Sequence, residues 1–328
     1  MQQSTGIASA FRWPPGWAAR RRFPLFLSAA LCDGKSGNGN RGGMNGSDFA
    51  YEIPGVVWRR DPRDALPLVL DSPHSGSSYP DDFSFCCPLS LLRRAEDAYV
   101  DELFDAAPEH GATLIAAVFP RSYLDVNRAA DDLDPALLAG SLPDRLKPRP
   151  ATRVGLVRRY AQPGVPIYDR KLQPDEVLAR VERYHLPYHR TLDEACDRLH
   201  AQFGAVWHIN CHSMPSTGSR AHGRKGEHGD FVLGDRDGTT CAPEFTEFVA
   251  RTLRGMGYEV HVNDGYKGVE LVRRQGRPHE QRHSLQIEVD RSLYMDQRTL
   301  EKHDGFEPLQ ADLAQLAQAL RGFVAARI

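Results

Sequence analysis

The stretch Ala205-Val-Trp-His-Ile-Asn-Cys211 decides the fold of this chain. It is a short, largely apolar run that leads directly into His212 and a polar segment, which is typical of a buried β-strand. A strong helical pattern precedes it over residues 174–203, and we expect a break or kink at Pro187 because proline cannot continue a regular helix. A buried strand that follows a long helix is the building unit of an α/β protein.

The rest of the chain repeats this alternation. Further buried strands are predicted at residues 66–70, 113–119, 231–233, 258–262 and 284–289, and further helices at 88–110, 243–256 and 308–325. The pattern predicts an α/β fold with a mainly parallel or mixed central sheet and helices on both faces. Residues 131–166 are rich in Pro, Gly and Arg, and we interpret them as a long surface excursion. Ligands of such sheets bind beyond the carboxyl ends of the strands.

Composition limits the class of protein. The chain has 328 residues and a net charge of −2, so nothing attracts it as a whole to nucleic acid or to an anionic membrane. Its six cysteines form no Cys-x-x-Cys pair, which favours a reduced, cytoplasmic protein. No apolar run is long enough for a membrane span. The sequence does not indicate an oligomeric state.

The amino terminus differs from the remainder. Residues 1–43 are basic, contain an apolar run at 23–32 and end in a Gly/Ser/Asn-rich tail. We predict a disordered extension, or sequence upstream of a true start at Met44, with a targeting peptide as the alternative. Residues 44–328 are then a single α/β domain.

Two histidines follow buried strands. His74 lies in Ser-Pro-His-Ser-Gly after the strand at 66–70, with Gly76 allowing close backbone approach, and His212 follows the strand at 205–211. Either one alone is equally typical of a histidine bonded to the backbone, but two in the same setting favour a metal site. We interpret His208, inside the strand, as a core residue or a support for the site.

Carboxylates are needed to complete such a site. Asp97 and Asp101 are four residues apart on the predicted helix, so they share one face and are candidate metal ligands, with a solvated acidic face as the alternative. Glu288 lies inside the apolar strand 284–289, where a carboxylate is costly unless it is paired or functional. It is the candidate general base, and a buried salt bridge to Arg291 is the alternative.

Arginine side chains follow the predicted strand at residues 113–119. Arg121 is a candidate for polarising a carbonyl oxygen, and Asn127 with Arg128 is a candidate clamp for a substrate carboxylate, because arginine binds carboxylates through two parallel hydrogen bonds. The alternative is that Arg128 pairs with a nearby aspartate.

These blocks together resemble one enzyme family. The segments SPHSG, DAYVDELF, RSYLDVNRAADDLDP, NCHSMPS, GDFVLGDRDGTTCAPEF, VNDGYKGVELVRRQGRP and HSLQIEVDRSLYMD, between about residues 70 and 296, are similar to those of N-formylglutamate amidohydrolases (N-formylglutamate deformylases). The resemblance implies a fold like that of zinc carboxypeptidases (a phosphorylase/hydrolase-like fold) and a divalent metal, zinc first. It implies hydrolysis of N-formyl-L-glutamate to formate and L-glutamate, a late step of histidine breakdown.

The resemblance also assigns roles and leaves some open. His74 and His212 would be metal ligands and Glu288 the base. Ser77 stands where the carboxypeptidase pattern has a glutamate, so the third ligand must come from elsewhere, with Asp101 or Asp97 as the candidate. Asn210 stands where relatives often carry an acid, so it would orient His212 more weakly.

The substrate is a small dicarboxylate, so two cationic contacts are expected. Arg128 is the first, and Arg159, Lys267 and Arg291 compete for the second. The alternatives are an amidohydrolase for another N-acyl amino acid, and a catalytically silent carboxylate-binding relative.

Overall fold

A mixed eight-stranded sheet forms the centre of the protein. The computed structural model describes residues 50–143, 154–216 and 228–328. The sheet order is β1-β2-β4-β3-β7-β10-β8-β9, and the four middle strands are parallel to one another. These strands are β4 (Thr113–Ala117), β3 (Leu68–Ser72), β7 (Val206–Met214) and β10 (Arg282–Asp290).

Antiparallel pairings flank this parallel centre. On one side, β2 (Val57–Arg60) runs antiparallel to β4, and β1 (Ala50–Ile53) runs antiparallel to β2. On the other side, β8 (Phe231–Gly234) runs antiparallel to β10, and β9 (Val260–Val262) runs parallel to β8. The predicted α/β fold with a mainly parallel, mixed sheet is therefore confirmed.

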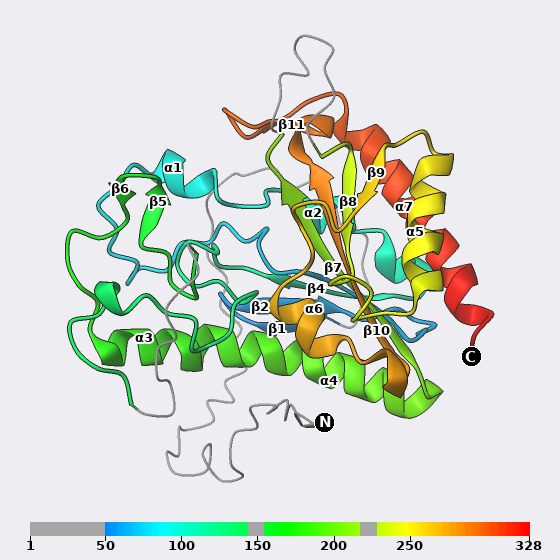
Figure 1. Ribbon diagram of the computed structural model, residues 1–328, viewed down its shortest axis with the longest axis horizontal. Helices are drawn as coiled ribbons and strands as arrows, with labels where there is room; N and C mark the ends of the chain where they lie inside the picture. The colour runs from blue at the N-terminus through cyan, green and yellow to red at the C-terminus, as the bar shows by residue number, and fades with distance from the viewer. Residues whose placement is uncertain (1–49, 144–153, 217–227) are drawn as a thin grey trace, which may run out of the picture. The chain divides into compact units, whose positions relative to one another are not determined.

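Helices cover both faces of the sheet (Figure 1). One face carries α3 (Pro174–Arg180) and α4 (Leu186–Phe203), with the short α6 (Glu270–Gln275); the other packs against α5 (Pro243–Gly255) and α7 (Phe306–Ala325). Shorter elements are α1 (Leu89–Arg93), α2 (Val100–Leu103), the 3₁₀ turns Ala107–His110, Pro135–Leu137, Pro278–Glu280 and Arg291–Leu293, and the strand pairs β5 (Tyr160–Gln162) with β6 (Val165–Pro166) and β11 (Met295–Asp296) with β12 (Glu301–Lys302).

All nine residues of β7 are buried, yet its two faces differ. Trp207, Ile209 and Cys211 belong to the apolar core that includes α5 and α7. The alternate side chains of His208 and Asn210 point to the other face, where they bond polar groups. Successive side chains of a strand point to opposite faces, so one strand serves both the core and the site.

The single helix predicted over residues 88–110 is wrong. The structure divides this segment into α1, α2 and a 3₁₀ turn, and Tyr99 before α2 has a left-handed backbone with φ of 66°. The backbone N–H of Asp97 donates to the carbonyl of His74 (3.0 Å) instead of to a helical partner. This tertiary bond offsets the lost helical pairing and holds Asp97 in a turn, so Asp97 and Asp101 do not share a helical face.

Two further expectations are modified. The helix over 174–203 continues through Pro187, because a π-helical turn at Val181–His185 immediately before it accommodates the proline. Residues 131–166 are no simple surface excursion, since Leu133, Leu156 and Val157 within their described part are buried.

Two other expectations concern membrane-spanning helices and the amino-terminal extension. In the part of the chain that the structure describes, no helix is both long and apolar enough to cross a membrane. The predicted extension, residues 1–43, lies outside the described residues, and the domain boundary stays a prediction.

Candidate metal centre and active site

Three buried side chains converge at the carboxyl ends of β3 and β7. The Nδ1 atoms of His74 and His212 are 3.1 Å apart, and Oδ2 of Asp97 lies 3.3 Å from the first and 2.9 Å from the second. All three residues are at most 2% exposed. Gly76 permits this packing, because a Cβ there would lie 2.4 Å from the backbone of Val118.

The outer nitrogen of each histidine is fixed by a hydrogen bond. Nε2 of His74 lies 2.7 Å from Asp125 Oδ1, and Nε2 of His212 lies 2.7 Å from Asn210 Oδ1. The amide of Asn210 is itself oriented, because its Nδ2 donates to Asp71 (2.8 Å). Each Nε2 therefore carries the proton and donates it outward, which leaves both Nδ1 atoms as acceptors.

This arrangement fits a divalent cation. Three acceptor atoms within hydrogen-bond distance of one another have no proton to share, so they need a positive charge between them. Ligand atoms of a tetrahedral zinc with bonds of about 2.0–2.2 Å stand about 3.3–3.5 Å apart, close to the spacing of the cluster. The donor set of two imidazoles and one carboxylate is also that of catalytic zinc sites.

Asp97 is held in its ionised form by two arginines. Arg291 Nη2 donates to its Oδ1 at 2.8 Å, and Arg121 Nη1 approaches the same oxygen at 3.5 Å. Burial alone would raise the pKa of Asp97, but the charge of Arg121 opposes burial, and the pKa lies well below its usual range. Oδ2 is thereby left for a cation.

Asp101 lies outside this cluster. It is half-buried on α2, where burial and the neighbouring Glu102 raise its pKa, although Ser75 bonds its side chain. Of the two aspartates predicted as ligands, the structure brings only Asp97 to the histidines.

Glu288 lies beside His212 in the sheet. The two residues are register partners in the parallel pair β7–β10, so their side chains project from the same face. The side chain of Glu288 accepts a hydrogen bond from Gln286 Nε2 (2.9 Å). Burial and the nearby charge of Asp97 raise the pKa of Glu288 well above its usual range, with Arg121 and Arg291 opposing them.

The predicted cations divide into two groups. Arg121 lies in the site, where Nη2 also binds Asp125 at 3.0 Å. Arg291 is there too, but its three donor nitrogens are engaged by Asp97, Ser213 and the carbonyl of Arg94. Arg291 thus supports Asp97, and no ion pair between Arg291 and Glu288 is found among the described residues.

The other two candidates face solvent. Lys267 is half-exposed and pairs with Asp237 (2.9 Å), and Arg159 is 42% exposed and pairs with Asp134 (3.2 Å). Neither bonds a member of the cluster among the described residues.

The Asn127–Arg128 pair has a divided role. Oδ1 of Asn127 accepts from the backbone N–H of Leu271 (2.9 Å), and its Nδ2 donates to Asn210 Oδ1 (3.4 Å), so this amide is used within the protein. Nε of Arg128 donates to the carbonyl of Val154 (2.8 Å), which leaves the two terminal nitrogens of Arg128 for an anion.

Several residues of the site were missed from the sequence. They are Asp71, Asp125, Arg158, Tyr266 and Gln286. Asp125 lies between Arg121 and Asn127 in a segment already singled out, so its proximity to them was a usable indication. Tyr266 is half-buried, and burial and Glu288 raise its pKa. No sequence pattern marked Arg158, which lies in the presumed surface excursion.

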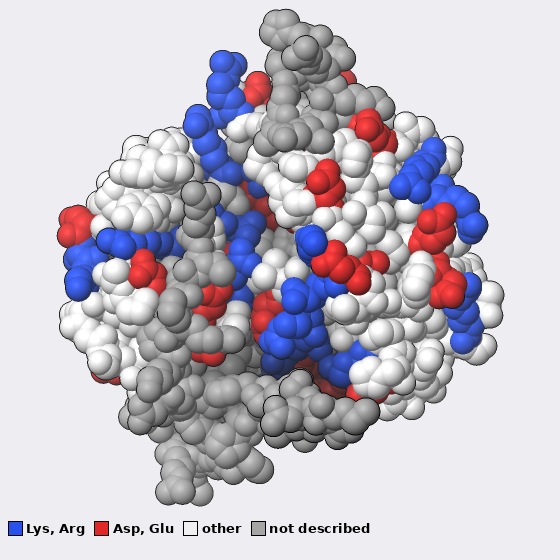
Figure 2. Space-filling view, viewed as in Figure 1, with Lys and Arg blue, Asp and Glu red and all other residues white. Residues whose placement is uncertain are grey.

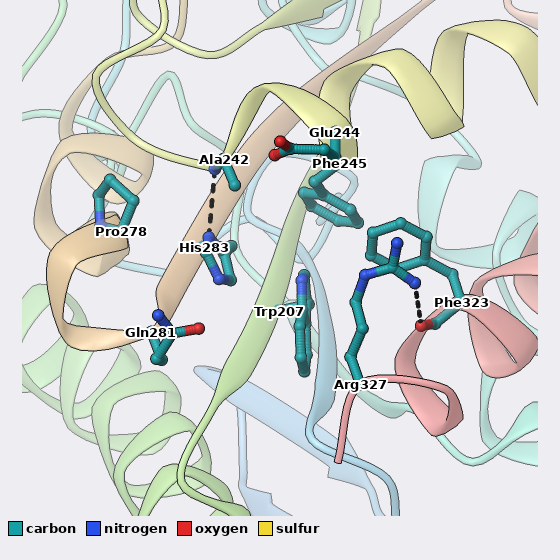
Figure 3. A pocket seen from close by; sticks show the side chains of 9 residues that line it. All are labelled: Trp207, Ala242, Glu244, Phe245, Pro278, Gln281, His283, Phe323 and Arg327. Carbon is teal, nitrogen blue, oxygen red and sulfur yellow. Dashed lines mark hydrogen bonds between the residues drawn. The ribbon is translucent and has the colours of Figure 1, made fainter.

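A separate hollow lies at the opposite end of the same strands. It measures about 330 Å³ and is lined by Trp207 and His283, the second residues of β7 and β10, by Phe323 of α7 and by Arg327 just after that helix (Figure 3). The described residues around it include no cluster of metal-binding groups. Ligand sites of parallel sheets are expected at the other edge, so we assign the chemistry to the histidine cluster.

The fold and this cluster define an α/β protein with a site suited to metal-assisted hydrolysis. The sequence profile of the N-formylglutamate amidohydrolase family matches residues 66–295. The chain belongs to this family.

Individual relatives agree with that assignment. The N-formylglutamate deformylase of Pseudomonas putida is 31% identical over 276 residues, which cover 80% of this chain and 95% of that enzyme. The crystal structure of N-formylglutamate amidohydrolase from Ralstonia eutropha JMP134 is 47% identical with a TM-score of 0.78, covering 84% of this chain and all of that one. A gene product of Agrobacterium tumefaciens, 17% identical with a TM-score of 0.59 over 82% and 96% of the two chains, shares the fold.

Proposed function

We propose that this protein hydrolyses N-formyl-L-glutamate to formate and L-glutamate. The observation that carries the proposal is the convergence of His74, Asp97 and His212 beside Glu288, in a chain that belongs to the N-formylglutamate amidohydrolase family. Such a site can activate water and accept a proton next to a bound amide, which is what hydrolysis of a formamide requires.

His74, Asp97 and His212 would hold the metal ion. A divalent ion, zinc first, would when bound polarise the formyl carbonyl and lower the pKa of a neighbouring water. Glu288 accepts the proton of the attacking water and passes it to the amide nitrogen as the C–N bond breaks, which yields formate and the free amine of glutamate. A carboxyl group whose pKa is raised from its usual range toward the operating pH can both accept a proton and give it up.

Recognition of the substrate rests on its charges. N-formylglutamate carries two carboxylates, and Arg128 offers its terminal nitrogens to one of them. Paired charges give far more selectivity than the small formyl group can, because a hydrogen-bonding site rejects analogues that leave its buried groups unpaired. Asn127 positions this loop through its bond to Leu271.

The metabolic pathway and the cell compartment are also part of the proposal. We place the reaction in histidine breakdown and in the cytoplasm. The free cysteines among the described residues support the cytoplasmic setting, which is reducing. Residues 1–43 are taken as an extension outside the catalytic domain.

Elemental analysis of purified protein coupled to a formate-release assay tests the function. We expect about one divalent ion per chain and release of formate from N-formylglutamate that stops when the ion is chelated. A panel of N-formyl, N-acetyl and N-succinyl glutamate and N-formyl aspartate defines the acyl pocket. Faster turnover of another acyl group would identify a different amidohydrolase, and bound dicarboxylate without turnover of any panel member would identify a silent binding protein.

A further inference from the structure

The segment around Leu156 is attached directly to the candidate site. The carbonyl of Leu156 accepts from the backbone N–H of Asp125 (2.8 Å), and its N–H donates to the carbonyl of Asp132 (2.6 Å). Asp125 is the residue that fixes the outer nitrogen of His74. Side chains that follow Leu156 therefore start next to the metal cluster.

Two consecutive arginines in this segment face different environments. Arg159 is exposed, pairs with Asp134 and lies over the ring of Tyr160, with 5.1 Å from its guanidinium carbon to the ring centre. Arg158 is turned inward, and its Nε is shielded from solvent and has no hydrogen-bond partner. No hydrogen bond or ion pair of the Arg158 guanidinium is found among the described residues.

The charges that act on Arg158 are those of the candidate site. Burial, together with the like charges of Arg121 and Arg128, lowers the pKa of Arg158 to about 9, while Asp125 and Asp97 oppose this change. At neutral pH the group is still charged. Both of these carboxylates already have partners. Asp125 is bound by His74 and Arg121, and Asp97 is bound by Arg291.

A shielded cation without a partner is costly, and a bound anion would remove that cost. The gathering of positive charge is also visible on the surface, where Lys and Arg side chains border a hollow near the middle of the face in Figure 2. Among the arginines of the site, Arg121 and Arg291 are committed to aspartates. Arg158 and Arg128 retain donors for a ligand.

We infer that Arg158 binds one of the two carboxylates of the dicarboxylic substrate, while Arg128 binds the other. Arg158 thereby takes the place for which Arg159, Lys267 and Arg291 were the candidates. The inference rests on the proposed function, because it names the group that makes the site selective for an N-formyl amino acid with a second carboxylate. Arginine suits this task through its planar pair of donors.

Arg158→Met tests the inference against three substrates. They are N-formylglutamate, N-formylglutamine, which lacks the side-chain carboxylate, and N-formylisoglutamine, which lacks the α-carboxylate. We expect kcat/KM for N-formylglutamate to fall about 100-fold, mainly through KM, as for loss of a buried charge pair. One of the two amides, N-formylglutamine or N-formylisoglutamine, lacks the carboxylate that Arg158 binds. For that substrate, kcat/KM should fall by less than about threefold in Arg158→Met.

Matched variants separate binding from folding. Arg159→Met removes the neighbouring exposed arginine and should change kcat/KM by less than about twofold. Arg158→Lys keeps the charge without the two-pronged geometry and should recover part of the loss. An equal loss of kcat/KM on all three substrates in Arg158→Met, or no loss on any, would overturn the inference.

Binding of glutarate distinguishes failure of the inference from failure of the proposed function. Titration calorimetry needs no turnover, and we expect Arg158→Met to weaken glutarate binding about 100-fold while Arg159→Met leaves it unchanged. Wild-type protein that binds glutarate but releases no formate contradicts the function and leaves Arg158 supported. Equal glutarate affinity of wild type and Arg158→Met contradicts the role of Arg158 whatever the enzyme hydrolyses.

Discussion

The two faces of the β7–β10 pair are built from alternate residues and serve different ends. On one face Ile209 and Ile287 are fully buried in the apolar core. On the other face His212 and Glu288, which are register partners, lie among charged and hydrogen-bonding groups. The comparison indicates that the first face supplies stability and the second supplies chemistry, although residues of the two faces alternate along each strand. Substitutions on the two faces should therefore have separable effects.

The largest effect is expected for His212→Ala. It removes one of three converging ligands, and the remaining His74 and Asp97 are too few for a tight site, so the protein should purify with little metal and lose nearly all turnover. Elemental analysis and the formate-release assay measure both. His279→Ala, which changes a histidine 77% exposed, is the control and should keep full metal content. Wild-type stoichiometry in His212→Ala would remove this residue from the ligand set.

Glu288→Gln should leave the metal and impair the reaction. The amide keeps the size of the side chain but cannot accept the proton of the attacking water, so kcat should fall at least about 100-fold with metal content near normal. Glu244→Gln alters an exposed carboxylate at the start of α5 and should have no effect on kcat. Full activity of Glu288→Gln would contradict its role as the base.

Much of this polar face could be predicted from the sequence. His74 and His212 follow apolar runs, and Glu288 interrupts one, so each stands out against a buried strand. Because parallel strands end at one edge of a sheet, their convergence followed from the fold class. The alternation of strands and helices was likewise sufficient for the central sheet, while the short edge strands β1 and β2 carried too little pattern.

The residues that the sequence left undecided or missed depend on tertiary contacts. Asp97 reaches the histidines because its backbone bonds the carbonyl of His74 and interrupts a helix that local propensity favours. Arg158 and Arg159 are adjacent and chemically identical, so only the packing of the chain around Leu156 decides which one faces inward. Arg291 was read as a substrate contact because its pairing with Asp97, 194 positions away, has no local pattern.

The opposite face is tested by Ile209→Ala. This substitution leaves a cavity in the core below α5 and α7, and it should lower the free energy of unfolding by about 2–5 kcal/mol. Urea denaturation measures the loss. Metal content and kcat of the folded variant should stay close to wild type, because the neighbouring polar side chains point away from the cavity. A large fall in metal content at unchanged stability would show that the two faces are not separable.

The smallest effect concerns the acid stability of the polar side of the sheet. His185 and His189, in the π-turn and α4, stack at 4.1 Å between ring centres, and their Nε2 atoms lie 2.9 and 2.8 Å from the carbonyls of Arg128 and Val126. Burial lowers the pKa of His185 to about 4, Arg274 contributes and Asp125 opposes.

Since the folded pKa of His185 is below the unfolded one, the unfolded chain binds more protons between about pH 6.5 and 4. The contribution to stability is complete above about pH 6.5 and is lost as the pH falls through this window, by up to roughly 3 kcal/mol. His185→Gln keeps a donor for the carbonyl of Arg128 but cannot titrate, so its unfolding midpoint in urea should fall less steeply with acid than that of wild type. His200→Gln, on the exposed side of α4, should follow the wild-type curve. Parallel curves for wild type and His185→Gln would mean that the buried histidine stack does not set the acid stability of the polar side.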